Sequence, residues 1–224
     1  MLKKNLFILV AVIGFGFSAN AQIKTIHVTP STAKIFLNSS EVGNGTYTYK
    51  FSKKTDFIML KFEAEGYLTK EVRLFRDNPN KDVAYTLAED EAEKNSVGGE
   101  NSVTVEKWFD ITVKQGMTED DAWKRIMSVV TNNFNDIEIR DKSAGWIKTA
   151  WSMQTFTYQF VRTRLEVKIA FGDENELKYR VRISSQIANR DCGRSDQCFV
   201  NYNRVLNKFA TIIQELQNVV GSNR

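Results

Sequence analysis

The chain of 224 residues has an ordinary hydrophobic fraction of 42%, and its 31 basic and 27 acidic residues leave a formal net charge of +4. This composition is typical of a globular protein and excludes a disordered chain. The near balance of charge also excludes bulk attraction to nucleic acid or anionic lipid, so any electrostatic partner must be held by a local patch.

The N-terminus has the three parts of a secretory signal peptide. Lys3-Lys4 is followed by the apolar run Leu6–Phe17 and by the small-residue stretch Ser18-Ala19-Asn20-Ala21. This order predicts a signal peptide over residues 1–21 that is cleaved after the last of these residues. The alternative is an uncleaved anchor, which needs about 18 or more apolar residues. Cleavage leaves 29 basic and 27 acidic residues, a net charge of about +2.

We therefore expect an exported protein that is periplasmic or outer-membrane-associated, or else extracellular. No cysteine lies near the cleavage site, which excludes lipid attachment in the manner of bacterial lipoproteins. No later segment is apolar enough to span a bilayer, so we expect no transmembrane segment in the mature chain.

Residues 22–88 contain short segments in which apolar and polar residues alternate, separated by turn residues such as Gly43-Asn44-Gly45. Alternation of period two with regular breaks predicts a small all-β sandwich. The expected strands are Ile26–Val28, Lys34–Leu37, Thr46–Phe51, Phe57–Glu63, Lys70–Phe75 and Val83–Leu87.

Three stretches of this first domain are similar to the PEGA family of bacterial surface domains. Val28–Leu37 has a strand, a proline, a small-residue turn and a second strand. Glu41-Val42-Gly43 resembles the following valine-glycine turn, and Phe62–Tyr67 resembles a late strand that ends in a glycine-aromatic pair. The resemblance implies an extracytoplasmic, non-catalytic module, and it supplies no active-site residues.

Residues 89–104 are rich in acidic, Asn, Ser and Gly residues and nearly lack large apolar side chains. Such a segment cannot bury enough surface to offset the loss of chain entropy, which predicts a linker between two domains.

Residues 105–220 mix helical and strand patterns. Thr118 can cap a helix that runs to Phe134, with Trp123 on its apolar face, and residues 205–220 repeat the same spacing in a second helix. The pattern predicts an α+β domain with two helices on one face of an antiparallel sheet. The expected strands are Ile137–Arg140, Gly145–Ser152, Tyr158–Phe171 and Leu177–Ile187. This order of elements, with Ala144-Gly145-Trp146-Ile147 at a strand entry, resembles the TBP-like helix-grip domains of envelope lipoproteins, a resemblance that carries no functional residues.

The only two cysteines, Cys192 and Cys198, are separated by a short polar stretch. An oxidising compartment favours a disulfide between them. Free thiols and a metal or redox site are the alternatives, although zinc requires three or four ligands and the sole histidine, His27, is distant in sequence.

Few residues indicate catalysis, and we expect no enzyme, cofactor or metal. Val42-Gly43-Asn44-Gly45 lacks the Lys-Ser or Lys-Thr of a phosphate loop. The acidic cluster Glu119-Asp120-Asp121 lies in a first helical turn, where the helix dipole favours negative charge. A carboxylate-dependent hydrolase of envelope glycans remains the alternative function.

The most suggestive feature is the long hairpin predicted around Gly172–Asn175. Alternation places six cations on the face opposite to its apolar residues, with Glu166 among them. They are Arg162, Arg164, Lys168, Lys178, Arg180 and Arg182. This face is either a solvated sheet surface or a binding site for an anion. Trp146 and Trp151 are an odd number of residues apart in one predicted strand, so they are expected on opposite faces of the sheet. If one of them is exposed, its ring could stack on a sugar.

Together these features predict an exported, non-enzymatic binding or scaffolding protein of the bacterial cell envelope. The expected partner is an envelope protein or an anionic glycan or lipid headgroup, bound through the basic sheet face. Export argues against nucleic acid. A third hypothesis is a structural adaptor whose sheet edge pairs with another chain.

Overall fold

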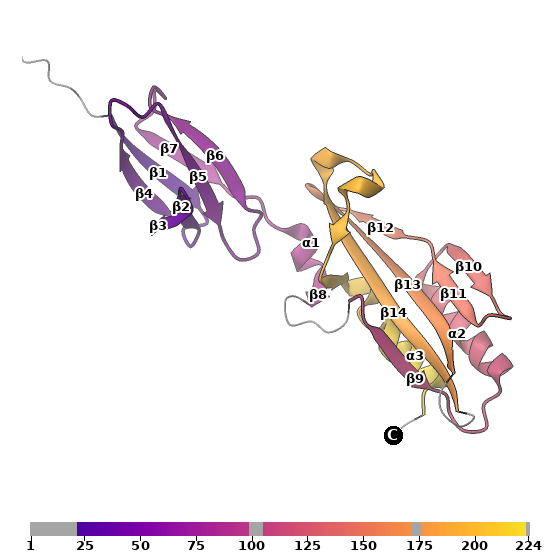
Figure 1. The fold of residues 1–224 in the computed structure, drawn as a ribbon. Helices are drawn as coiled ribbons and strands as arrows, with labels where there is room; N and C mark the ends of the chain where they lie inside the picture. Colours follow the sequence, from indigo (N-terminus) through magenta and orange to yellow (C-terminus); the bar gives the residue numbers. More distant parts are fainter. Residues whose placement is uncertain (1–21, 99–104, 172–175, 223–224) are drawn as a thin grey trace, which may run out of the picture. The chain divides into compact units, whose positions relative to one another are not determined.

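The computed structural model describes residues 22–98, 105–171 and 176–222, which form several sheets and few helices (Figure 1). The chain divides into two compact units between Ala88 and Glu89. The expected signal peptide, residues 1–21, lies outside the described residues. No helix in the described part of the chain is both long and apolar enough to cross a membrane.

The first unit consists of two sheets that share one hydrophobic core. The first sheet has the order β4 (Thr46–Lys50), β1 (Ile23–Thr29) and β7 (Asp82–Thr86). The second has the order β3 (Ser40–Asn44), β2 (Lys34–Leu37), β5 (Phe57–Glu63) and β6 (Lys70–Phe75). Alternate residues of each strand point inward and include Ile26, Val28, Ile35, Ile58, Leu60, Phe62 and Leu74.

Strand β3 is not predicted by the sequence, which indicates only turn residues in this region. It forms because Asn38 and Ser39 both adopt positive φ angles, 48° and 68°, between the paired residues Leu37 and Ser40. Two consecutive residues with positive φ make the tight hairpin turn whose twist matches that of the strands. The chain therefore folds straight back along β2.

The second unit is built around the antiparallel pair β13 (Gln159–Phe171) and β14 (Leu177–Asn189). On the outer side of β13 lie β11 (Trp146–Thr149) and β12 (Ser152–Thr155), and β10 (Ile137–Asp141) pairs with β11. On the outer side of β14 lie β9 (Trp108–Thr112) and β15 (Val200–Asn201). All these pairings are antiparallel, as Figure 1 shows for the central strands.

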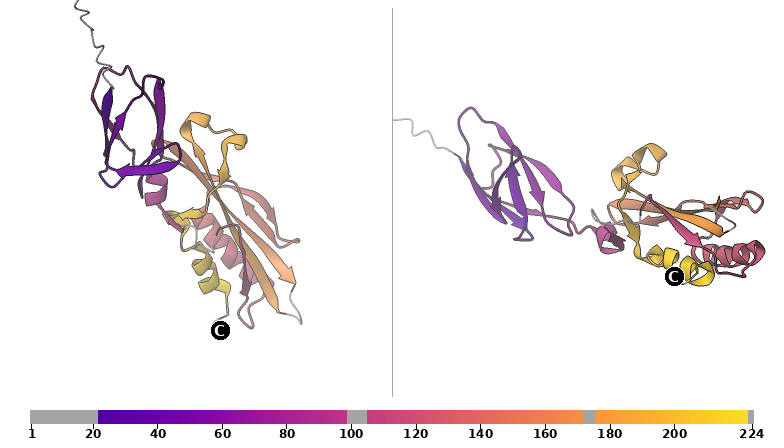
Figure 2. Two further views of the ribbon diagram at one scale, coloured as in Figure 1. Left: turned by 60° about the vertical axis from the view of Figure 1, so that its left-hand side comes forward. Right: turned by 60° about the horizontal axis from the view of Figure 1, so that its bottom comes forward.

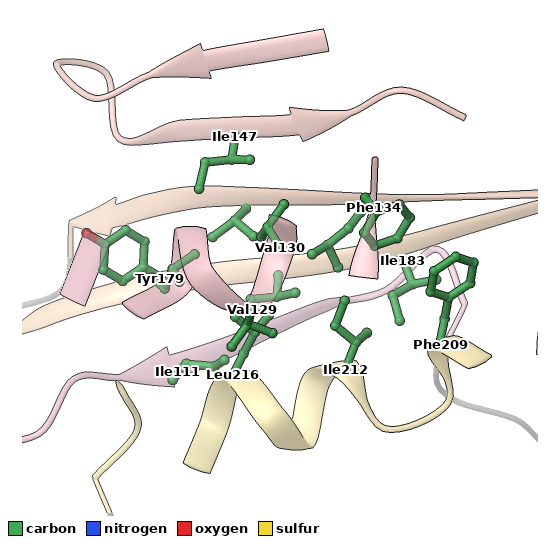
Figure 3. Close-up of a cluster of buried hydrophobic side chains, with 14 of the residues drawn as sticks. Ile111, Val129, Val130, Phe134, Ile147, Tyr179, Ile183, Phe209, Ile212 and Leu216 are labelled. Carbon is green, nitrogen blue, oxygen red and sulfur yellow. The ribbon is translucent and has the colours of Figure 1, made fainter. Parts of the chain in front are cut away.

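Two helices, α2 (Glu119–Asn133) and α3 (Ile212–Val220), cover one face of this sheet (Figure 2, right). The predicted first helix is confirmed: the Thr118 hydroxyl accepts a hydrogen bond from the Asp121 amide, and Trp123 is buried. Figure 3 shows how side chains from both helices meet those of the sheet. The shared core includes Ile111, Val129, Val130, Phe134, Ile147, Tyr179, Ile183, Phe209, Ile212 and Leu216.

The second helix is shorter than the sequence predicts. Residues 205 and 206 belong to strand β16 (Arg204–Leu206), which pairs with β8 (Ser96–Gly98) and leads into the 3-10 turn η3 (Asn207–Phe209). The buried positions of this stretch fit helical spacing, but β8 supplies the hydrogen-bond partners of its backbone. The prediction of a continuous helix over residues 205–220 is therefore wrong before residue 212.

Residues 89–98 are folded, in contrast to the predicted linker over residues 89–104. They form α1 (Glu91–Lys94) and β8, and Ala92 is fully buried. The Glu91 carboxylate accepts hydrogen bonds from the Thr157 amide at 3.0 Å and from its hydroxyl at 2.6 Å. Ser96 Oγ lies 3.0 Å from Tyr202 Oη. Partners distant in sequence therefore order this polar segment, while residues 99–104 lie outside the described ranges.

Replacing Phe209 by alanine should destabilise the second unit by about 3 to 5 kcal/mol, because a buried aromatic ring would leave a cavity. Its ring stacks on Phe134 with a centroid distance of 4.5 Å. All four tryptophans belong to this unit, so urea unfolding followed by tryptophan fluorescence reports its stability alone. The control is alanine at Tyr158, an exposed aromatic residue. Equal effects of both variants would contradict the packing described above.

Candidate functional site: the open face of the second sheet

The sheet face opposite to α2 and α3 carries a set of charged and aromatic residues, which we call the open face. Within the described residues, no α-helix packs against it. Its members are fixed by the register of the strands, in which Glu166 lies opposite Arg182 and Lys168 lies opposite both Arg180 and Trp146. The open face comprises Trp108, Asp110, Trp146, Lys148, Trp151, Arg162, Arg164, Glu166, Lys168, Lys178, Arg180 and Arg182.

Glu166 is the electrostatic centre of the open face. Its side chain is only 8% exposed, and its carboxylate accepts hydrogen bonds from Arg182 Nη2 at 2.6 Å and from Trp146 Nε1 at 3.0 Å. Lys168 Nζ lies 2.8 Å away. Burial alone would raise the pKa of Glu166, but the hydrogen bonds and charges of Lys168 and Arg182 outweigh it and hold this pKa below its usual range. The carboxylate therefore stays ionised and pairs with two of the six cations, whose combined charge it reduces by one unit.

Two tryptophan rings are packed against these cations. Lys168 Nζ lies 4.7 Å from the centre of the Trp146 ring and 5.5 Å from that of Trp108. The Arg182 guanidinium lies 4.6 Å from the Trp108 ring. A cation over an aromatic face is attracted by the ring quadrupole. Both tryptophans are half-buried, so part of each residue is exposed to solvent.

Arg162 is not exposed as the sequence predicts. It is 7% exposed, and its Nε and Nη2 donate to Gln186 Oε1 at 2.9 and 2.7 Å. Nη1 binds Asp196, and the guanidinium lies between the rings of Trp151 and Phe199. These contacts hold a neighbouring segment on the sheet, so Arg162 has a structural role.

That segment contains the disulfide. The bond between Cys192 and Cys198 is confirmed, with a Cα–Cα distance of 5.7 Å. Phe199 follows the bond and packs against Phe160 and Ala188, which have the same strand parity as Arg162. The disulfide segment therefore covers one end of the open face and defines its limit.

Arg164 differs from the other five predicted cations. Lys168 and Arg182 bind Glu166, while Lys178 lies 3.2 Å from Glu176 and Arg180 lies 3.0 Å from Asp110. Within the described ranges, Arg164 has no carboxylate at ion-pair distance. Its guanidinium rests 4.3 Å from the Trp151 ring and is partly exposed. It is therefore available to an external carboxylate or phosphate.

Trp151 and Trp146 lie on the same face, so the prediction of opposite faces is wrong. The register of β12 against β13 is one residue out of step with that of β11 against β13, so one extra residue is inserted between β11 and β12. This insertion, a β-bulge, reverses the parity of the residues that follow. Buried Thr149 lies at this point, where its hydroxyl accepts a hydrogen bond from the Leu165 amide.

Strand β9 brings Trp108 to the open face, and sequence reasoning missed this strand. Its signal is present but short: Phe109 and Ile111 alternate with Asp110 and Thr112. Such a pattern is typical of a half-buried strand. The pairing with β14 could not be read from the sequence, because these strands are about 70 residues apart.

Two carboxylates of the predicted acidic cluster, those of Asp120 and Asp121, have structural partners. Asp120 lies 2.6 Å from Lys142 Nζ, and this contact lowers the pKa of Asp120. Asp121 takes part in the cap formed by Thr118. His27 lies in the first unit, 3.7 Å from Asp82. Among the described residues, no three His, Cys, Asp or Glu side chains are grouped so that they could hold a metal ion.

Comparison of the chain with models of known protein families and with curated proteins gives no match.

Replacing Glu166 by glutamine should destabilise the second unit by about 2 kcal/mol at pH 7, because two cations lose their charged acceptor. The pKa of Glu166 is lower in the folded state than in the unfolded state, where it is about 4.3. The ionised carboxylate therefore stabilises the fold at pH values above about 4.3, and this contribution is lost as the pH falls through the folded-state pKa. The difference between the wild type and the variant in urea unfolding should therefore shrink below that pH.

The matched control is Glu138→Gln, which removes an exposed partner of Lys148. Its effect should stay below about 1 kcal/mol. A Glu166→Gln difference that persists unchanged down to pH 2.5 would contradict the charge-based role of Glu166.

Proposed function

We propose that this chain is an exported, non-enzymatic binding or scaffolding protein of the bacterial cell envelope, and that its open face binds a protein partner. The observation that carries the proposal is the group of half-buried tryptophans interleaved with arginine and lysine on a sheet face that no α-helix of the described residues covers. Trp and Arg are the residues that contribute most to binding energy at protein interfaces.

The arrangement of these side chains favours a structured partner over a bulk polyanion. Five of the six predicted cations have a carboxylate neighbour, so most of these cations are already paired and less available to a polymer of acidic groups. Arg164 is the exception. The cation–aromatic contacts also restrain the side chains before binding, which reduces the entropy lost on association. We therefore expect a partner that places one acidic group against Arg164 and apolar groups against Trp151.

Export to the envelope rests on the signal peptide predicted over residues 1–21. The Cys192–Cys198 disulfide supports an oxidising compartment, in the periplasm or at the outer membrane. We further propose that residues 22–88 form a PEGA-type module and that the second unit is of the helix-grip type. The two sheets around one core and the two helices on one sheet face are compatible with these assignments.

A hydrolase that acts on envelope glycans is the alternative function. Its general acid would need a raised carboxyl pKa. Among the described residues, the carboxyl groups with a displaced pKa are Glu91, Asp120, Asp141 and Glu166, and hydrogen bonds or neighbouring charges lower the pKa of each. This pattern is typical of structural carboxylates and supports the binding function.

The proposal can be tested by site-specific photo-crosslinking in the native envelope. Met153 is exposed and lies opposite Arg162 on the open-face side of β12, so a photoreactive residue there should capture the partner protein. Adding Arg164→Glu and Trp151→Ala should lower the yield at least tenfold, as expected for removal of interface hot spots.

The matched control for charge reversal is Arg125→Glu on the exposed side of α2, which should leave the yield unchanged. Tryptophan fluorescence verifies that each variant is folded. Capture of glycan alone, or an equal yield from the wild type and the Arg164 and Trp151 variant, would overturn the proposal.

A further inference from the structure

One end of the first unit exposes large apolar side chains. Ile23 is 51% exposed, Phe57 is 42% exposed and Phe75 is 46% exposed. The two phenylalanines are cross-strand partners with ring centroids 5.9 Å apart. They project from the outer face of their sheet, because the residues next to them, Ile58 and Leu74, are buried in the core.

Hydrogen bonds show that these residues belong to the same end of the unit. The Phe51 amide donates to Gln22 O at 2.9 Å, which joins the end of β4 to the start of β1. Arg76 Nη1 donates to Lys53 O at 2.6 Å, which joins the end of β6 to the loop before β5. Thr25 N donates to Lys81 O at 2.8 Å, which adds the start of β7. We call this group of segments the basic end.

The basic end carries exposed cations that, within the described residues, have no carboxylate at ion-pair distance. The Arg73 guanidinium lies 4.5 Å from the Phe57 ring. The other such cations are Lys50, Lys53, Lys54 and Lys81. Of the nearby acids, Asp56 is paired with Arg76 at 3.2 Å, and Asp82, 3.7 Å from His27, adds one negative charge. Asp77 adds one further negative charge, so positive charge dominates this surface.

We infer that the basic end is a docking site for an anionic lipid surface. Exposed aromatic side chains beside basic residues fit the boundary between lipid headgroups and acyl chains, where the rings insert and the cations meet anionic headgroups.

The contrast with the open face supports this choice of partner. On the open face most cations are paired with carboxylates, whereas most cations of the basic end remain available to an external charge. Several dispersed cations match the many charges of a lipid surface better than a single acidic group. The site lies in the other unit, so its failure would leave the proposal for the open face untouched.

The test is flotation of the protein, as exported and processed by an expressing host, with vesicles of phosphatidylcholine containing 30% phosphatidylglycerol. Mass spectrometry first verifies that residues 1–21 are absent, because their apolar run would bind vesicles by itself. The protein should float with these vesicles, and much less with pure phosphatidylcholine or in 0.5 M NaCl. Phe57→Ser combined with Phe75→Ser should reduce binding at least tenfold, and Lys53→Glu combined with Lys54→Glu should do the same at low salt.

The control combines Tyr158→Ser and Val200→Ser, which remove equally exposed apolar side chains from the second unit and should leave flotation unchanged. Circular dichroism verifies the fold of each variant. No flotation of the folded wild type, or equal flotation of the phenylalanine variant, overturns the proposal. Self-association that depends on Phe57 and Phe75 without vesicle binding overturns it as well, and identifies a second copy of the chain as the occupant.

Discussion

The continuous pairing of β13 with β14 is the constraint on which the second unit depends. Each strand has 13 residues, and the register determines whether a described side chain lies on the side of the helices or on the open face. Shifting the register by one residue would exchange the two faces and bury arginines among the apolar side chains of α2 and α3. The burial of Leu165, Val167 and Val181 therefore determines where the charged side chains lie.

Gathering cations on one sheet face creates a second requirement, because like charges on neighbouring strands repel each other. Glu166, in the same strand as Lys168, supplies one compensating negative charge, and Asp110 of β9 supplies another beside Arg180. The aromatic rings add further attraction and limit side-chain motion. The outcome is an ordered surface on which most cations have a carboxylate partner, whereas among the described residues most exposed cations of the basic end have none at ion-pair distance. The two surfaces therefore suit different partners.

The disulfide segment determines where the open face ends and which of its cations are exposed. Arg162 has the strand parity of a surface residue, yet Asp196 and Phe199 from this segment cover it. Because the cysteine bond closes a short loop, it restricts the conformations available to that cover. The exposed part of the site thus begins with Arg164 and Trp151, where the cover ends.

The sequence by itself determined what depends on neighbouring residues: the alternation of the hairpin, the capped helix α2 and the pairing of the only two cysteines. The tertiary structure decided which cations remain available, because Asp110 and Asp196 reach them from distant segments. It also decided the side of Trp151, since a one-residue bulge has no periodic signal. The tertiary structure also decided that the polar residues 89–98 fold, because their burial and hydrogen bonds come from strands and loops far along the chain.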